Sequence, residues 1–157
     1  MLSRTEYLRR KFEARMNKAV DFAYANCCRD FDIAEMADAA CFSRYHFHRL
    51  FYAMTGETPG EFVKRLRLAR AAGLLRNRPD LDITGVALNS GFSGSSVFSR
   101  AFKDRFGVSP SAFRSASNAR LEEILRRAGL KDSKESQTEG KAGSLKGKVP
   151  QDSDPLT

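Results

Sequence analysis

The apolar residues of this chain recur at helical spacing over its first 114 positions. Met16, Val20, Ala23 and Cys27 are three or four residues apart, which places them on one face of a helix. They predict a first helix over residues 13–26 with Cys27 in the core. No stretch alternates apolar and polar residues for long enough to suggest a β-strand. The pattern therefore predicts an all-α fold.

Start and stop signals divide the following residues into further helices. Asp32 and Glu35 have the spacing of a capping box, which predicts a short helix ending near residue 39. Ser43 is expected to cap a longer helix that ends at Gly56. Thr58, with proline next and glutamate three residues on, predicts a long helix over residues 59–76.

The passage from Asp82 repeats the passage from Asp32. Asp32-Ile33, Ala37 and Phe42 recur 50 residues later as Asp82-Ile83, Ala87 and Phe92. Five further residues recur at a spacing of 51: Phe47, Phe51, Gly56, Pro59 and Phe62, as Phe98, Phe102, Gly107, Pro110 and Phe113. Each copy is a short helix, a tight turn and a longer helix, which is the helix-turn-helix unit. The fold expected is thus two helix-turn-helix units joined by a long linker helix of roughly 27 Å.

The remaining chain is poorer in core residues. The stretch 118–129 has apolar residues at helical spacing, with Asn118 expected to cap the helix and Gly129 to end it. From residue 131 onward the composition predicts a disordered tail. The domains expected are an N-terminal leader (1–12), the double helix-turn-helix domain (13–114), a short helical extension (115–130) and the tail (131–157).

Charge points to an anionic partner. The 157 residues carry 27 Lys and Arg against 19 Asp and Glu, a formal charge of +8, nearly all of it before residue 115. Nucleic acid is the first candidate partner and a membrane surface the second. No apolar run is long enough for a spanning helix or a signal core, which indicates a cytoplasmic protein without a membrane partner.

Catalytic and metal sites find little support in the sequence. Three cysteines, two of them adjacent, do not make a disulfide framework. His46 and His48 point to different sides of a helix and no metal-ligand spacing is present, so neither a metal nor another cofactor is expected. His46 is expected to be packed or locally bonded. Cys28 or Cys41 could serve as a redox or effector thiol, although a structural role is the simpler interpretation.

The second helices of the two units have outward faces suited to DNA. Residues 43–53 and 95–103 contain no acidic residue. An arginine side chain can donate hydrogen bonds to both O6 and N7 of guanine, and a serine hydroxyl can form hydrogen bonds with bases or phosphates.

At these residues the chain resembles the AraC/XylS family of bacterial transcription regulators, over roughly residues 16–114. The second half carries the more specific pattern, from Gly91-Phe92 through Phe98-Ser-Arg100 to Phe106-Gly107-Val-Ser-Pro110. In the first half, residues 42–51 are similar to the branch that often carries a GyrI-like ligand-binding domain, and we expect that domain to be absent here. The resemblance implies a seven-helix, homeodomain-like domain and a non-enzymatic regulator, with activators among its relatives.

The resemblance also implies which residues meet DNA. The residues expected to contact bases are Tyr45, His48, Arg49, Ser95, Ser96, Ser99 and Arg100. The residues expected to contact phosphates are Ser43, Arg44 and Lys103. Double-stranded DNA is the expected partner, bound by a monomer in two adjacent major grooves, with RNA polymerase a candidate second partner. A truncated regulator and a non-specific basic nucleic-acid binder remain the alternatives.

Two positions depart from the family pattern. Cys41 stands where the turn usually carries glycine, which costs about 1–2 kcal/mol if the backbone there is left-handed. Gly85 stands where an acidic residue is common, and glycine weakens a short helix by about 1 kcal/mol relative to alanine.

Overall fold

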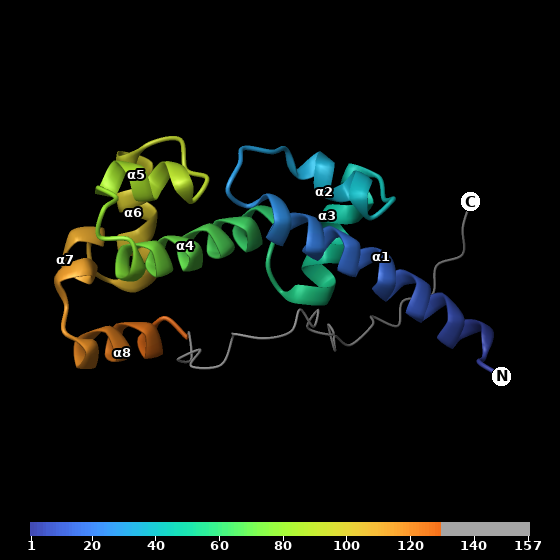
Figure 1. Ribbon diagram of the computed structural model, residues 1–157. Helices are drawn as coiled ribbons and strands as arrows, with labels where there is room; N and C mark the ends of the chain where they lie inside the picture. Colours follow the sequence, from blue (N-terminus) through green and yellow to red (C-terminus); the bar gives the residue numbers. More distant parts are fainter. Residues whose placement is uncertain (130–157) are drawn as a thin grey trace. The chain divides into compact units, whose positions relative to one another are not determined.

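The computed structural model describes residues 1–129, which form eight α-helices and no strand (Figure 1). This confirms the predicted all-α fold. The described chain divides into two compact units: unit 1 contains Met1–Ala25 and Phe31–Val63, and unit 2 contains Asn26–Asp30 and residues 64–129. The tail predicted over residues 131–157 lies outside the described residues.

Unit 1 contains a helix-turn-helix. Its helices are α1 (Arg4–Asn26), α2 (Ile33–Ala39), α3 (Arg44–Thr55) and the first residues of α4 (Pro59–Asn77). Helix α4 is continuous and supplies residues to both units, as the long linker helix was predicted to do.

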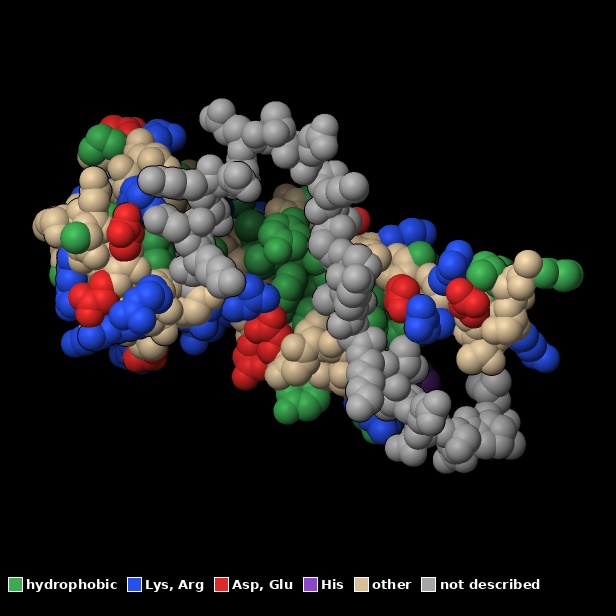
Figure 2. Space-filling view, turned by 90° about the horizontal axis from the view of Figure 1, so that it is seen from below, with side chains coloured by type: hydrophobic (Ala, Val, Ile, Leu, Met, Phe, Trp, Pro, Cys, Tyr) green, Lys and Arg blue, Asp and Glu red, His purple; other side chains and the backbone are tan. Residues whose placement is uncertain are grey.

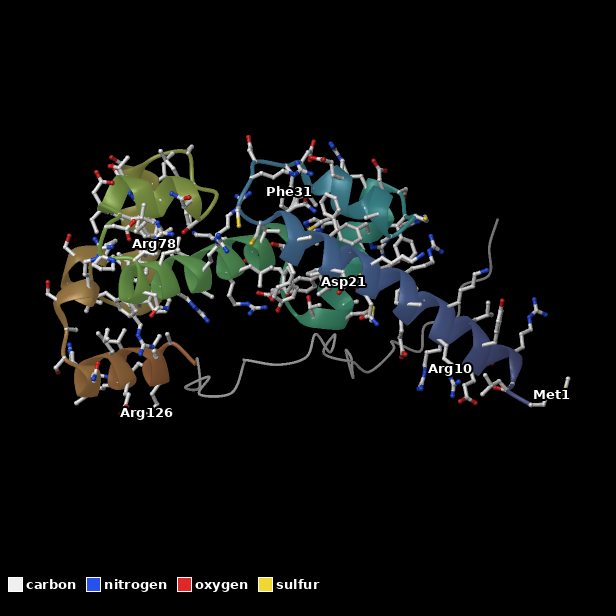
Figure 3. The ribbon with its side chains drawn as sticks, in the orientation of Figure 1. Met1, Arg10, Asp21, Phe31, Arg78 and Arg126 are labelled. Atoms are coloured by element: carbon white, nitrogen blue, oxygen red, sulfur yellow. The ribbon has the colours of Figure 1, made fainter. Side chains whose placement is uncertain are left out.

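Helix α1 begins at Arg4, whereas the apolar stripe predicted a start at residue 13 and a leader before it. Ser3 Oγ accepts a hydrogen bond from the Glu6 N–H at 3.2 Å, and Arg10 pairs with Glu6 at 3.3 Å. The label in Figure 3 places Arg10 in this first part of α1. Caps and pairs one turn apart stabilise a helix without any apolar face, so the stripe could not reveal this extension.

The core of unit 1 is built on aromatic rings. Phe51 is fully buried and lies 5.5 Å from Phe47 and 5.3 Å from Phe62 between ring centroids. Phe31, in the segment before α2 (Figure 3), meets Phe22 edge to face at 5.4 Å. Small and flexible apolar residues complete this core: Met16, Ala19, Ala23, Met36, Ala37 and Ala40.

Unit 2 repeats the arrangement. It contains the rest of α4 and then α5 (Ile83–Asn89), α6 (Ser95–Phe106), α7 (Pro110–Ser115) and α8 (Asn118–Arg127). Phe102 is central, with ring centroids of Phe98, Phe106 and Phe113 at 5.5, 4.4 and 5.2 Å. Helix α8 packs Leu121 and Ile124 into this cluster.

The caps decide where the helices begin and end. The capping box of Asp32 and Glu35 is present, and the box of Thr58 and Glu61 has hydrogen bonds of 2.8 and 3.2 Å. Ser43 caps α3 as predicted. The predicted cap at Asn118 is wrong: Ser117 Oγ accepts the Arg120 N–H, and Asn118 is the first helical residue.

Candidate nucleic-acid interface

The turn of unit 1 is held by an arginine from α1. Cys41 has φ 57°, so this turn does place a non-glycine residue in the left-handed region. Arg15 Nε donates to the Ala40 carbonyl oxygen at 2.9 Å, and Nη2 donates to the Cys41 carbonyl oxygen. The Arg15 guanidinium also lies 3.8 Å from the centroid of the Phe42 ring. These contacts fix the turn between α2 and α3, and the sequence pattern had not singled out Arg15.

The turn of unit 2 is held by arginines from α4. Gly91 has φ 87°, and a Cβ atom there would lie 2.3 Å from the Cys27 carbonyl oxygen. Arg67 Nε donates to that same oxygen at 2.9 Å. Arg70 Nε donates to the Asn89 carbonyl oxygen at 3.1 Å. Glycine is therefore required at residue 91 by both its backbone conformation and the close approach.

The outward face of α3 carries the side chains predicted to meet bases. Tyr45, His48 and Arg49 are all exposed, Tyr45 at 68%. The Arg49 guanidinium carbon lies 5.7 Å from the Tyr45 ring centroid, so the two side chains support each other one turn apart. His46 is also exposed, 6.0 Å from Tyr45 between ring centroids, which corrects the expectation of a packed His46.

Two residues predicted to contact phosphate already have partners in the fold. Ser43 Oγ accepts the His46 N–H at 3.3 Å as the cap of α3. Arg44 pairs with Asp32 at 2.8 Å, and both side chains are about two-thirds exposed (66% and 64%). An exposed pair of this kind contributes little to stability, so the Arg44 guanidinium can exchange Asp32 for another anion at small cost.

The outward face of α6 is smaller and more polar. Ser96, Arg100 and Lys103 are exposed, whereas Ser95 and Ser99 are half-buried. Helix α6 begins after Gly94, and no side chain of the described residues caps it. Backbone N–H groups at such a helix start can bond to phosphate oxygens.

Two exposed apolar or aromatic residues lie among these side chains without having been predicted. Tyr52 is 55% exposed and follows Arg49 by three residues on α3. Val97 is 57% exposed and precedes Arg100 by three residues on α6. The sequence does contain a signal for such residues: a large apolar or aromatic side chain that lies outside the buried face of an amphipathic helix. An exposed valine beside an arginine can meet a thymine methyl group while the arginine meets guanine.

Arg100 and Val97 also line a hollow of unit 2 with a volume of about 620 Å³. Cys28, Lys64 and Arg67 are further members of its wall. The residues that line the hollow include three cations, Lys64, Arg67 and Arg100, and two carboxylates, Asp30 and Asp104, so the net charge of its wall is positive.

On the face shown in Figure 2, Lys and Arg side chains are interspersed with Asp and Glu side chains.

Burial and pairing shift two acid-base equilibria in unit 2. Burial raises the pKa of the Cys27 thiol, and the neighbouring Cys28 adds to the effect. Hydrogen bonds from Arg78 lower the pKa of Asp80. The Cys27 thiol therefore stays protonated at neutral pH, as expected of a core cysteine.

Within residues 1–129, no three His, Cys, Asp or Glu side chains gather where they could hold a metal ion. In the same part of the chain, every helix is too short or too polar to cross a membrane.

Comparisons with known proteins agree with this geometry. A helix-turn-helix domain family matches residues 36–116. The probable transcription factor PqrA of Proteus vulgaris is 38% identical over 82 residues, which are 52% of this chain and 66% of PqrA. The transcriptional activator RhaS of Escherichia fergusonii is 33% identical over 110 residues, 70% of this chain and 39% of RhaS. The chain thus spans between about a third and two thirds of the curated relatives it matches.

Solved structures give the same result. The DNA-binding domain of AdpA, in complex with a target DNA, aligns with a TM-score of 0.63 at 30% identity, covering 68% of this chain and 95% of that domain. A regulator with an AraC-type DNA-binding domain from Chromobacterium violaceum aligns with a TM-score of 0.61 at 28% identity, covering 65% and 90%. With its two helix-turn-helix units, its glycine-dependent second turn and these matches, the chain belongs to the AraC/XylS family of helix-turn-helix proteins.

Proposed function

We propose that this protein is a sequence-specific, DNA-binding transcription regulator that inserts α3 and α6 into adjacent major grooves of one site. The observation that carries the proposal is the repeated face: each second helix exposes an arginine and hydrogen-bonding neighbours on the side opposite its buried phenylalanines. A helix with such a face fits the major groove, where base edges differ in their donors and acceptors.

Base discrimination is assigned first to Arg49 and Arg100, which can each bond to guanine O6 and N7. Tyr45, His48, Ser96 and the half-buried Ser95 and Ser99 flank them as further base contacts, and Val97 offers a methyl contact. Ser43, Arg44 and Lys103 are assigned to phosphates, which set register without reading sequence. Exchange of Asp32 for a phosphate oxygen would let Arg44 join the interface.

The relatives support a role in transcription. AdpA is described as a global transcriptional factor and RhaS as a transcriptional activator. Binding as a monomer follows from the proposal, because one chain then supplies both reading helices. Activation through RNA polymerase and a cytoplasmic location complete the proposed picture.

The test is binding selection on the purified full chain. Duplexes with a randomised 30-base-pair centre would be enriched over several rounds, and the enriched sequence would be titrated against a scrambled one across a salt series. We expect a site of about two helical turns, preferred at least about 10³-fold at physiological salt. Equal affinity for both duplexes with a steep salt slope would instead identify a non-specific basic binder.

A further inference from the structure

Two adjacent cysteines, Cys27 and Cys28, directly follow α1 and have no role in the proposed DNA interface. Their sulfur atoms lie 3.8 Å apart, in the turn directly after the helix. Cys27 is 7% exposed, whereas Cys28 is exposed and lines the hollow of unit 2 together with Lys64 and Arg67. The Cys28 thiol is thus accessible and lies in a positively charged wall, and the buried Cys27 thiol is next to it.

The peptide bond between these cysteines takes part in holding the turn of unit 2. Its carbonyl oxygen, that of Cys27, accepts the Arg67 Nε–H at 2.9 Å and lies against Gly91 so closely that a Cβ there would be at 2.3 Å. Arg67 donates a second hydrogen bond to the Arg29 carbonyl oxygen, also at 2.9 Å. The backbone around the thiol pair is therefore part of the support of the turn that leads into α6.

We propose that Cys27 and Cys28 are a modification site, a vicinal dithiol that hydroperoxides oxidise to a disulfide, and that this oxidation loosens the turn at Gly91. The Cys28 thiol gives up its proton and its sulfur attacks a peroxide oxygen, so a sulfur–oxygen bond forms, the O–O bond breaks and the alkoxide leaves as an alcohol with that proton. The Cys27 sulfur then attacks the Cys28 sulfenic acid, the S–S bond forms, and the hydroxyl leaves as water with the Cys27 proton. Two thiols and one hydroperoxide give one disulfide, one alcohol and one water, with two electrons passing from sulfur to oxygen.

The order of the two steps follows from the surroundings of each sulfur. Cys28 is the thiol that a small peroxide can reach from the hollow. Cys27 is buried, and burial raises its pKa, so it stays a thiol and acts as the resolving partner. A sulfenic acid with a second thiol beside it proceeds to a disulfide in preference to higher oxidation states.

Ring closure must move the carbonyl that the turn uses. The disulfide ring contains the Cys27–Cys28 peptide bond, and the sulfurs must approach from 3.8 Å to about 2.0 Å. Adjacent Cα atoms across a trans peptide are about 3.8 Å apart, closer than the roughly 4.4–6.8 Å usual for a disulfide. Closing this small ring therefore strains the planar peptide and its flanking torsions, and we expect the strain to move the Cys27 oxygen away from Arg67 and Gly91. A strained disulfide is also easily reduced, so the modification is reversible.

Peptide mapping of the oxidised full chain tests the chemistry. Trypsin releases residues 19–29, which contain Cys27 and Cys28, and residues 30–44, which contain Cys41. After graded tert-butyl hydroperoxide and iodoacetamide, we expect peptide 19–29 to be unalkylated and two hydrogens lighter than the dithiol, while Cys41 remains alkylated. Dithiothreitol should restore both alkylation sites. Sulfinic acid at Cys28, or a disulfide between two chains, would overturn the proposal.

Hydrogen exchange of the turn tests the coupling. Amides of residues 88–93 should exchange roughly tenfold faster after oxidation, since a charge-assisted hydrogen bond of the turn is lost. Cys28→Ser should abolish this change and Cys41→Ser should not. A disulfide that forms without faster exchange at the turn would refute the coupling.

The effect on DNA rests on the proposed function, and the other two measurements do not. We expect oxidation to weaken binding to the selected duplex about tenfold in the parent and in Cys41→Ser, but not in Cys28→Ser. A reduced protein that does not bind DNA would contradict the proposed function, and the mass and exchange data would still decide the thiol chemistry.

Discussion

Cys41 and Gly91 occupy equivalent positions fifty residues apart and share a left-handed backbone, with φ 57° and 87°. Cys41 is exposed, so its side chain has room in the solvent. Gly91 has the Cys27 carbonyl oxygen and Arg67 Nε directly against it, at 2.3 and 2.8 Å from where a Cβ would lie. The same backbone conformation thus tolerates a side chain in one turn and excludes it in the other.

Replacing these residues should have opposite effects. Cys41→Gly removes the strain of a side chain in the left-handed region and should raise the free energy of unfolding by about 1 kcal/mol. Gly91→Ala adds both strain and a collision with backbone, and should lower it by about 3 kcal/mol or more. Urea unfolding followed by circular dichroism measures both. Equal effects of the two variants would contradict the assignment of the close approach at Gly91.

Ser90 offers a second comparison between the units. Its side chain is fully buried, and its hydroxyl has no hydrogen-bond partner among the described residues, while the equivalent Ala40 is also fully buried. Ser90→Ala should therefore stabilise the protein by about 1 kcal/mol, because it removes a buried unpaired polar group. Ala40→Ser is the reciprocal control and should destabilise it by a similar amount. A loss of stability in Ser90→Ala, read from the same unfolding curves, would mean that the hydroxyl is paired.

Alanine substitutions at Gly73 and Gly85 distinguish the effect of helix propensity on stability from the effect of local crowding. An added Cβ at Gly73 in α4 meets nothing within 4 Å, so Gly73→Ala should stabilise the protein by about 1 kcal/mol. At Gly85 the Cβ would lie 3.0 Å from Asp82 Oδ1, which caps α5 by accepting the Gly85 N–H at 2.6 Å. Gly85→Ala should gain clearly less than Gly73→Ala in thermal melting. An equal gain would show that the Asp82 cap adjusts without cost.

Arginine substitutions test the reading helices. Arg49→Ala and Arg100→Ala should each weaken binding to the selected duplex by about 1–3 kcal/mol and relax the preference at one base position. Arg126→Ala, an exposed arginine of α8, is the control for lost charge. Fluorescence anisotropy with the selected duplex and its single-base variants measures both effects. If the Arg126 variant loses as much as the other two, net charge rather than base contact explains the binding.

The pair of Arg78 and Asp80 gives a pH prediction. Arg78 donates to both carboxylate oxygens at 2.9 and 2.8 Å, and these bonds lower the pKa of Asp80 below 3.8. A lowered pKa in the folded state means that the pair stabilises the fold above pH 3.8, and that this contribution disappears as the pH falls through the lowered pKa. In Arg78→Gln the carboxyl should titrate closer to 3.8, as followed by carbon NMR. An unchanged midpoint would show that Arg78 does not hold the carboxylate in solution.

The features that could be predicted from the sequence are those determined by residues close together in the chain. The caps at Asp32, Ser43 and Thr58 involve residues two or three positions apart, so their spacing is visible in the chain itself. The exposed positions of Tyr45, His48, Arg49, Ser96, Arg100 and Lys103 followed from the buried phenylalanine stripes.

Contacts between distant residues could not be predicted in the same way. Arg15 and Arg70 reach carbonyl oxygens 25 and 19 residues away, and no short sequence pattern distinguishes them from the other arginines of the chain. The start of α1 was missed because its first turns bury no apolar stripe. The cap of α8 was displaced by one residue because serine and asparagine, both good caps, are adjacent.

Arginine side chains hold the two turns, and the side chains that face outward on α3 and α6 are not needed for this support. Arg15 and Arg70 bind the backbone oxygens of Ala40 and Asn89, which every amino acid provides, so these two contacts do not depend on the side chains of the residues that they hold. The outward side chains of α3 and α6 can then be exchanged with little effect on folding. A family built in this way can acquire new binding preferences by single substitutions, and its members can diverge in target while keeping one scaffold.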